Sequence, residues 1–423
     1  MIDKTMKVGL TRRDWGVILV LAAVNFLHIV DFVIIMPLGD QLMRELQLNP
    51  AQFGYIVSAY AVCAMIATLA ASFVIDRFDR KTVLIVAFSG FGLSTLFCGL
   101  AGDYQTLLMA RGLAGVFGGL SAGAIMAVIG DHFADARRGT AMGAVMSAFA
   151  VASSVGLPLG LWMANNLGRG APFVAIAVLS IPVVIAVAIW LPSMRDHRTP
   201  GRLHSPVADF AAVVATPRHL ISFAFMFALV MGTFTIIPFL APYMQRNAGR
   251  PPEDIPIIYL VAGICTLFSM NVIGRMTDSY GKRPVFRVMA SMALIMTLIL
   301  TNLPVVSVAI AVITASLFMV SASGRMVPAQ ALMLATATPG VRGAFVNINS
   351  AVQHLAMSVA PTISGAIMGG GKDQPLTGYS EVGYVAGGFA VLSLVLAEFI
   401  RPAPITSASQ ISDAAVEVEA VLV

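Results

Sequence analysis

The chain has 423 residues, of which 58% are hydrophobic and only 11% are charged, and its mean hydropathy is +0.87. Charged residues make up about a quarter of an ordinary soluble domain, so this composition argues against a water-soluble fold and favours a protein surrounded by lipid. The net charge of +5 does not indicate a nucleic-acid-binding protein, because the basic residues lie in short segments between apolar runs.

Twelve apolar segments follow one another along the chain, each long enough to cross a bilayer as a helix of about 20 residues. The first is longer than the apolar core of a signal peptide, so we expect it to stay in the protein as a membrane helix. The expected spans cover residues 15–38, 52–75, 82–101, 106–130, 140–165, 172–192, 219–242, 255–275, 284–303, 305–334, 342–369 and 383–400.

The basic residues of the connecting segments are distributed unequally between the two sides of the membrane. Segments on the side of the N-terminus hold roughly four times as many Lys and Arg residues as segments on the opposite side. Because positive loops stay in the cytoplasm, this bias predicts a multi-pass membrane protein with both termini cytoplasmic.

The longest polar connection separates the sixth span from the seventh and divides the chain into two halves. We predict an N-terminal six-helix bundle over residues 1–192, a cytoplasmic linker over 193–218, a C-terminal six-helix bundle over 219–402 and a disordered cytoplasmic tail over 403–423. This division predicts two units of similar architecture, which is typical of secondary transporters.

A short charged motif recurs at the same place in each half. Asp76-Arg77-Phe78-Asp79-Arg80-Lys81 follows the second span, and Asp278-Ser279-Tyr280-Gly281-Lys282-Arg283 follows the eighth. Each copy has an acid at the end of a helix and two bases four and five residues later. Such an internal repeat supports two parallel six-helix units.

The second copy, extended back to Gly274, resembles the loop motif Gly-x-x-x-Asp-Arg-x-Gly-Arg-Arg of the major facilitator superfamily, and the resemblance covers about residues 10–402. The first copy departs from it, with Ser72 and Asp79 where the motif has glycines. The run from Arg111 to Gly115 resembles the family's Arg-x-x-x-Gly motif. Further segments of the tenth and eleventh spans contribute to the resemblance, at residues 324–328, 342–345 and 349–353. Together these motifs resemble the arabinose-efflux-like permeases of the drug–proton antiporter group.

The resemblance implies an all-α integral membrane protein of twelve helices in two pseudo-symmetric six-helix bundles. It implies a monomer in the cytoplasmic (inner) membrane of a bacterium. It also implies a latch, in which loop charges of one half meet helix ends of the other and close the cytoplasmic side; the same charges can instead only anchor the loops inside the cell. The expected latch residues are Asp76, Arg77, Arg80, Lys81, Asp131, Asp278, Lys282, Arg283 and Arg342.

The fifth span contains Gly156, Pro158 and Gly160, which resemble the glycine–proline motif typical of the family's exporters. Glycine permits close contact between membrane helices, and proline bends them. Ordinary helix packing is the alternative interpretation of these residues.

Ionisable residues within the spans are few, and a charge at the bilayer centre costs about 3 kcal/mol or more, so each should face protein or water. Asp31 and Arg111 lie at similar depths in the first and fourth spans, which line the central cavity in the family. We therefore expect them to be neighbours. Asp31 can couple transport to protons, form a static pair with Arg111, or bind substrate directly.

Further polar residues within the spans are candidates for the wall of a substrate cavity, although each can instead be a hydrogen-bonding helix residue. This set consists of Asn25, His28, Arg111, Arg325, Asn347, Gln353 and His354. The abundant Met and Phe residues, 24 of each, suit an adaptable apolar cavity.

The sequence predicts a secondary active transporter that exports a small drug-, sugar- or metabolite-like molecule by alternating access, coupled to proton antiport. It contains no nucleotide-binding loop and no metal-ligand spacing, so we expect a proton gradient as the driving force, no cofactor and no catalytic residue. The expected partners are the substrate, protons and lipid, without nucleic acid. A proton-coupled importer or uniporter remains open, as does a membrane sensor that transports nothing.

Overall fold

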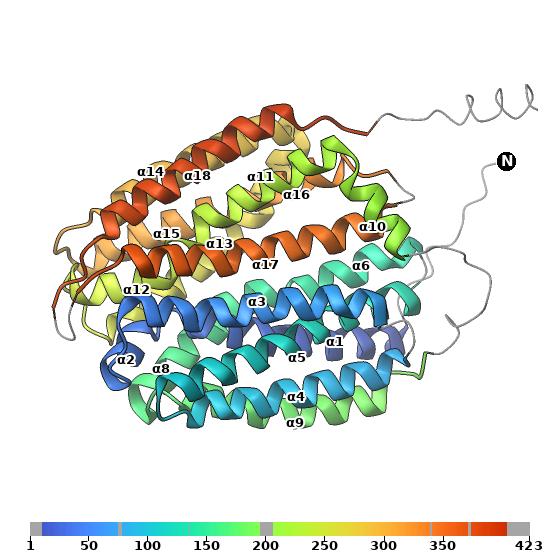
Figure 1. Ribbon diagram of the computed structural model, residues 1–423, viewed down its shortest axis with the longest axis horizontal. Coiled ribbons are helices and arrows are strands. Elements are labelled where there is room, and N and C mark those ends of the chain that lie inside the picture. Colours follow the sequence, from blue (N-terminus) through green and yellow to red (C-terminus); the bar gives the residue numbers. More distant parts are fainter. Residues whose placement is uncertain are drawn as a thin grey trace, which may run out of the picture.

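The computed structural model describes residues 11–74, 78–133, 135–194, 206–338, 341–370 and 374–403, and nearly all of them are helical (Figure 1). In the first part of the chain the helices are α1 (Arg12–Ile34), α2 (Gly39–Glu45), α3 (Pro50–Val74), α4 (Arg80–Leu100), α5 (Tyr104–His132), α6 (Asp135–Met146), α7 (Ala148–Val151), the π-helical turn η2 (Ala152–Gly156), α8 (Leu157–Leu167) and α9 (Ala171–Trp190). In the second part they are α10 (Pro206–Val214), α11 (Pro217–Phe234), α12 (Ile237–Arg246), α13 (Asp254–Tyr280), α14 (Lys282–Thr301), α15 (Val308–Gly324), α16 (Met326–Leu334), α17 (Arg342–Ile367) and α18 (Tyr379–Phe399).

Within these described ranges, ten helical segments are long and apolar enough to cross a membrane; two of them are the pairs α11–α12 and α15–α16. The other two expected spans are helical but fall outside this group. The span at 140–165 is divided into α6, α7, η2 and α8, and the span at 342–369 is the single helix α17, which carries several Asn, Ser, Gln and His residues. The prediction of an all-α membrane protein is confirmed.

The helices run between two ends of the bundle, which we call the terminal face and the distal face. The terminal face is where α1 begins and α18 ends, and the distal face is where α2 and α12 lie (Figure 1). Helices α1 to α9 gather on one side as the first group, and α11 to α18 gather on the other as the second group. The exact domain boundaries stay a prediction, because residues 195–205 and 404–423 lie outside the described residues.

Local side-chain caps determine where several helices begin. Thr11 and Asp14 form a reciprocal capping box at the start of α1, with bonds of 2.9 and 3.1 Å. Asp103 accepts the Thr106 backbone N–H at 2.9 Å at the start of α5, and this bond lowers the pKa of the Asp103 carboxyl. These caps fix the residue at which each helix begins.

Among the described residues, the buried apolar core that joins the two groups lies toward the distal face. There a single cluster of buried residues joins the groups and includes Ile34 and Phe53 of the first and Phe239 and Phe318 of the second. Toward the terminal face the larger clusters, one around Phe88 and one around Phe225, each stay within one group. In the described part of the chain, the buried apolar core therefore joins the two groups toward the distal face.

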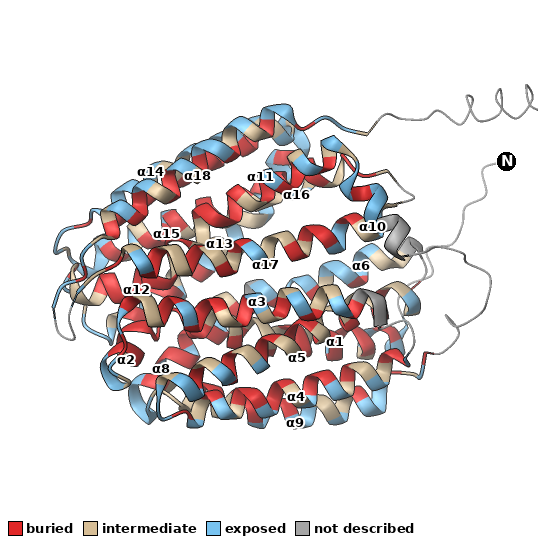
Figure 2. Ribbon diagram, in the orientation of Figure 1, coloured by how far each residue is buried: buried red, intermediate tan, exposed pale blue. Residues whose placement is uncertain are grey.

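The outer faces of the bundle are apolar yet exposed. Figure 2 shows exposed residues along the outer sides of α4, α9, α14 and α18. They include Ile185 and Ile189 on α9 and Val395 and Phe399 on α18. Apolar surface this extensive does not face water in a soluble monomer, so these faces contact lipid.

Candidate functional site

A buried ion pair joins α1 and α5 within the first group. Arg111 Nη1 lies 3.0 Å from Asp31 Oδ2 and also donates to the Asp31 backbone carbonyl at 3.2 Å. Both side chains are fully buried. Among the described residues, Asp31 Oδ1 and Arg111 Nε and Nη2 have no hydrogen-bond partner. The pair is therefore isolated from solvent in this conformation but is not saturated with hydrogen bonds.

Tyr60 on α3 connects this ion pair to the centre of the molecule. The Arg111 guanidinium carbon lies 4.5 Å from the centroid of the Tyr60 ring, which is a cation–π geometry. The ring also neighbours His28 and Phe32 on α1, with centroid distances of 5.9 and 5.2 Å. A change in the position of Arg111 would thus reach the Tyr60 ring directly.

Glycines on α5 make room for Tyr60. A Cβ on Gly115 would lie 2.2 Å from the Tyr60 carbonyl oxygen, so α3 approaches α5 at backbone contact. A Cβ on Gly118 would lie 2.4 Å from the Tyr60 hydroxyl and 2.8 Å from His28 Nε2. The Arg-x-x-x-Gly motif therefore has two physical roles here, because Arg111 binds Asp31 and Gly115 permits the close packing of α3.

A cavity of about 250 Å³ lies between the two groups. His28, Phe32 and Tyr60 line it from the first group, and Tyr259 and His354 line it from the second. Its wall is mostly apolar, and it includes the further residues Val33, Met36, Pro37, Phe149, Ser153, Leu157, Phe234, Ile237, Ala262, Gly263, Thr266, Leu267, Met270, Met319, Ser323 and Met357. Both groups therefore contribute side chains to its wall.

Of the residues expected in the cavity wall, only His28 and His354 line this cavity. Asn25 donates instead to the Val145 carbonyl at 3.1 Å, which ties α1 to α6. Arg325 lies in the break between α15 and α16 and donates to Thr233 Oγ1 at 2.7 Å and to the Leu229 carbonyl at 3.3 Å. On α17, Asn347 is exposed and Gln353 is partly buried.

The two groups meet closely at the distal face along α3 and α17. A Cβ on Gly54 would lie 2.4 Å from the Pro361 carbonyl oxygen, and one on Gly365 would lie 2.7 Å from the Pro50 carbonyl oxygen. Ser58 Oγ donates to the Ser358 carbonyl at 2.6 Å. This contact leaves no space for even one methyl group between the helix backbones.

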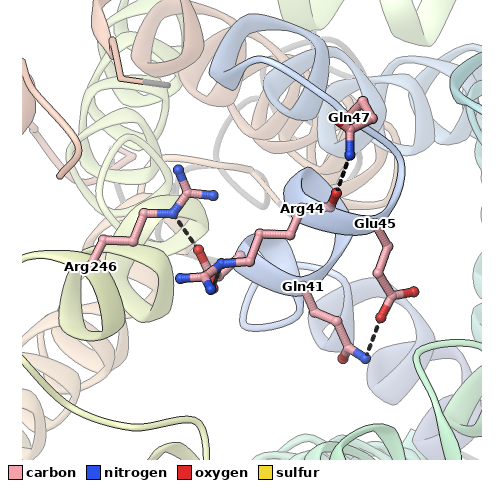
Figure 3. Close-up of polar contacts among 6 residues, drawn as sticks. Gln41, Arg44, Glu45, Gln47 and Arg246 are labelled. Atoms are coloured by element: carbon pink, nitrogen blue, oxygen red, sulfur yellow. Dashed lines mark hydrogen bonds and ion pairs between the residues drawn. The ribbon is translucent and has the colours of Figure 1, made fainter. Parts of the chain in front are cut away.

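An ion pair between the groups completes the distal closure. Arg246 of α12 pairs with Asp40 of α2, and both side chains are only 4% exposed. Arg44 reaches the same carboxylate at 2.9 Å, so two guanidinium groups from opposite groups converge there (Figure 3). Gln41 donates to Glu45 at 2.8 Å, and Gln47 donates to the Arg44 carbonyl at 2.9 Å. These two bonds stabilise α2 and its C-terminal turn.

The ion pairs described at the terminal face stay within one group. Arg80 binds Asp131 at 2.9 Å, and Arg137 binds Asp14 at 3.1 Å. In the second group, Lys282 donates to the Ala331 carbonyl at 3.2 Å, and Arg283 donates to the carbonyl of Ile400.

The remaining residues of the expected latch lie near helix ends at the terminal face or outside the described residues. Asp278 and Arg342 lie exposed at the terminal ends of α13 and α17, and Lys81 is partly buried near the start of α4. Asp76 and Arg77 lie outside the described residues. The cross-group latch at this face therefore stays a prediction.

The glycine–proline segment lies where α8 meets α1. A Cβ on Gly156 would lie 2.5 Å from Val30, and a Cβ on Gly160 would lie 2.8 Å from Ile34. Pro158 is buried in the first turn of α8, directly after the π-helical turn η2. On its other side η2 contacts α13, because a Cβ on Gly263 would lie 2.7 Å from the Ser154 Cα.

Sequence reasoning did not find Tyr60 and Tyr259, although both line the cavity and neither hydroxyl has a hydrogen-bond partner among the described residues. The signal for Tyr60 is its place at the eleventh residue of the 25-residue helix α3, far from the interfaces where membrane tyrosines usually lie. The sequence also did not predict that Asp79 binds the segment that follows α9. Asp79 accepts bonds from Ser193 Oγ at 2.7 Å and from the Met194 backbone N–H at 2.9 Å.

Comparisons with known proteins agree with this arrangement. The chain is 23% identical over 371 residues to Multidrug resistance protein 2 of Bacillus subtilis (strain 168), covering 86% of this chain and 91% of that protein. It is 22% identical over 366 residues to Inner membrane transport protein YdhP of Escherichia coli O157:H7, covering 82% and 87%.

Among solved structures, a bacterial homologue of the human lysosomal transporter Spinster, in an inward-facing and unoccupied conformation, matches with a TM-score of 0.73 at 16% identity, covering 93% of this chain and 97% of that one. The profile of the Major Facilitator Superfamily matches residues 21–324 and 222–418. These two matches together extend over most of the chain. The protein therefore belongs to the Major Facilitator Superfamily and is a multi-pass membrane transporter, not an enzyme.

Proposed function

We propose that this transporter exports a small molecule by alternating access in exchange for protons, and that Asp31 carries the proton. The observation that supports this most is the Asp31–Arg111 pair, fully buried and one aromatic ring away from the cavity between the groups. Its similarity to a bacterial multidrug resistance protein favours export over import. Its similarity to an inner membrane transport protein favours the bacterial inner membrane. The excess of Lys and Arg in the segments on the side of the N-terminus favours a cytoplasmic terminal face.

The conformation described here corresponds to the state that loads substrate from the cytoplasm. The groups are joined at the distal face by Asp40 and Arg246 and by the contact of Gly54 with α17. At the terminal face, a Cβ on Gly143 of α6 or Gly274 of α13 would meet nothing within 4 Å. A rocking motion of one group against the other would reverse this pattern around the cavity.

Proton binding at Asp31 would influence the cavity through Arg111 and Tyr60. While the carboxylate is charged, it holds the guanidinium on α1; once protonated, it loses most of this attraction and Arg111 is held by the Asp31 carbonyl and the Tyr60 ring. Since Asp31 has no solvent exposure here, it exchanges its proton when the distal face opens. The proton and the substrate then favour opposite states, which is the requirement for exchange.

Replacement of Asp31 by asparagine is expected to abolish proton-driven accumulation of substrate while leaving downhill exchange. One proton moving through 100 mV provides about 2.3 kcal/mol, enough for a substrate gradient of roughly 50-fold. In proteoliposomes with an imposed proton gradient, accumulation should approach this gradient for the unaltered protein and fall to equilibration for Asp31→Asn. A panel of neutral, cationic and anionic aromatic compounds supplies the transported probe.

The matched control is Asp103→Asn, which makes the same chemical change at an exposed helix cap that asparagine also serves. It should retain the full gradient. Accumulation by Asp31→Asn equal to that of the control would reject Asp31 as the coupling residue. Binding of a probe without any flux in the unaltered protein would favour the sensor over the transporter.

A further inference from the structure

A shallow groove of about 450 Å³ runs along the outer face of α14. Its lining consists of Arg287, Val288, Ser291, Met292, Ile295 and Met296. Residues at this spacing form one continuous stripe along a helix. From Arg287 to Met296 the stripe is about 14 Å long at 1.5 Å per residue, which is roughly half the hydrocarbon thickness of a bilayer. The groove therefore has the length of one lipid leaflet.

The surface that carries this groove faces lipid. Val288 and Ile295 are 62% and 53% exposed, and the outer side of α14 is exposed along its length (Figure 2). Met292 and Met296 are partly buried beside them. The unbranched methionine side chain adapts to irregular apolar shapes. These four residues make a wall suited to a lipid acyl chain.

An exposed ion pair lies at the terminal end of the groove. Arg287 Nε donates to Glu398 Oε1 at 2.8 Å, and Arg287 Nη2 donates to Glu398 Oε2 at 2.6 Å. The two side chains are 56% and 40% exposed, so both are accessible to a ligand. Glu398 is the second-to-last residue of α18, which ends at the terminal face. The pair therefore lies at the level of the lipid head groups, above a groove that runs into the hydrocarbon.

The ion pair leaves binding capacity on both of its members. Glu398 takes two of the five N–H groups of the Arg287 guanidinium, and the other three have no partner among the described residues. Two N–H groups on one edge of a guanidinium bind a phosphate in a bidentate manner. The Glu398 carboxylate, with lone pairs remaining on both oxygens, favours a cationic donor beside that phosphate.

Ser291 supplies a third polar group, one turn deeper than Arg287. Its side chain is exposed, and its hydroxyl forms no hydrogen bond with the described residues. By contrast, Thr297 of the same helix donates to its own backbone, at the Ala293 carbonyl, at 2.8 Å. Four residues of helix place Ser291 about 6 Å below Arg287. The glycerol esters of a phospholipid lie directly below its phosphate, so the Ser291 hydroxyl can donate to an ester carbonyl.

We propose that this groove binds a phospholipid whose head group carries both a phosphate and a primary ammonium, as in phosphatidylethanolamine. Arg287 binds the phosphate, Glu398 binds the ammonium and Ser291 binds an ester, while one acyl chain follows the groove toward Met296. The lipid belongs to the leaflet at the terminal face. This site is independent of the transport mechanism proposed for Asp31, because it lies on the outer surface of the second group.

The test measures lipid binding to the purified, delipidated full-length protein by native mass spectrometry, with the first bound lipid quantified in each titration. The probes are phosphatidylethanolamine, phosphatidylcholine and phosphatidylglycerol with the same palmitoyl and oleoyl chains. Phosphatidylcholine keeps the positive charge but has methyl groups in place of the ammonium N–H groups, and phosphatidylglycerol has no ammonium. Phosphatidylethanolamine should bind about three- to fivefold more tightly than either, as for one exposed ion pair.

Three variants assign the contacts. Glu398→Gln should lower the affinity for phosphatidylethanolamine to that for phosphatidylcholine. Arg287→Gln removes the partner of the phosphate and should weaken all three lipids by about three- to fivefold. Ser291→Phe places a ring in the groove without altering the ion pair and should also weaken all three. The matched controls Glu381→Gln and Arg275→Gln make the same changes at exposed positions on α18 and α13 and should leave the lipid preference unchanged.

Equal affinity for phosphatidylethanolamine and phosphatidylcholine would overturn the inference, as would a preference for phosphatidylethanolamine that persists in Glu398→Gln. Tighter binding of phosphatidylglycerol would identify a site for anionic lipids instead. Unchanged affinities in Ser291→Phe would show that the acyl chain lies elsewhere and would also reject the site. Each altered side chain is exposed, so the variants should fold, and a thermal unfolding curve for each one checks this.

Discussion

Substitution of Arg111 by methionine should lower the free energy of unfolding of the detergent-solubilised protein by about 3–5 kcal/mol. The physical reason is that Asp31 would keep its place in a fully buried site without its counter-ion at 3.0 Å. The Tyr60 ring would also lose its cation–π partner. Thermal and denaturant unfolding measure this loss of stability, with the fraction of protein that stays monodisperse as the signal.

Two further variants separate the lost charge pair from lost packing. Asp31→Asn combined with Arg111→Met removes both charges and should recover most of the stability, because an uncompensated ion is the costly species. Arg287→Met removes the same kind of side chain from an exposed pair with Glu398, where the partners are 56% and 40% exposed, and should cost about 1 kcal/mol or less. If Arg111→Met were no more harmful than Arg287→Met, the low-polarity environment assigned to the pair would be wrong.

Introduction of valine at Gly54 should open the distal face. The Cβ alone would lie 2.4 Å from the Pro361 carbonyl oxygen and 3.3 Å from the Gly365 Cα, so the backbones of α3 and α17 must separate. Overpacking of this kind costs about 1–3 kcal/mol, which shifts the ratio of distally closed to distally open molecules by roughly 5- to 150-fold. Substrate transport should fall accordingly, because the closed state becomes rare.

Distances between spin labels measure this opening. Labels at Asn166 on α8 and Glu381 on α18 report on the two groups at the distal face, in a background without Cys63, Cys98 and Cys265. The distance distribution should move to longer values in Gly54→Val. It should not move in Gly388→Val, since a Cβ at Gly388 would meet nothing within 4 Å. An unchanged distribution in Gly54→Val would contradict the tight seam between α3 and α17.

Depth in the membrane could be predicted from the sequence, and this was enough to bring Asp31 and Arg111 together. Each lies about six residues from a recognisable helix end, so counting residues placed them at one level. Other ion pairs of the first group, such as that of Arg137 with Asp14, were not predicted.

The direction in which a residue faces could not be predicted in the same way. Helices in lipid are apolar on all sides, so no hydrophobic stripe shows which face is inward. Asn25 and Arg325 lie at depths suited to a cavity, yet Asn25 turns to α6 and Arg325 turns to α11. The cavity wall depends on such rotations and on the π-helical turn η2. The motif of Gly156, Pro158 and Gly160 indicated a bend at this place but not its π-helical form.

The unfilled space beside Gly139, Gly143, Gly274 and Gly343 at the terminal face has a practical consequence. Larger side chains at these positions fit the present shape without strain. Under the proposed rocking motion, they would hinder the approach of α6, α13 and α17 to the opposite group. Such substitutions would hold the protein in the distally closed conformation. The resulting homogeneous sample would suit the selection of antibodies against this conformation and the growth of crystals with a bound ligand.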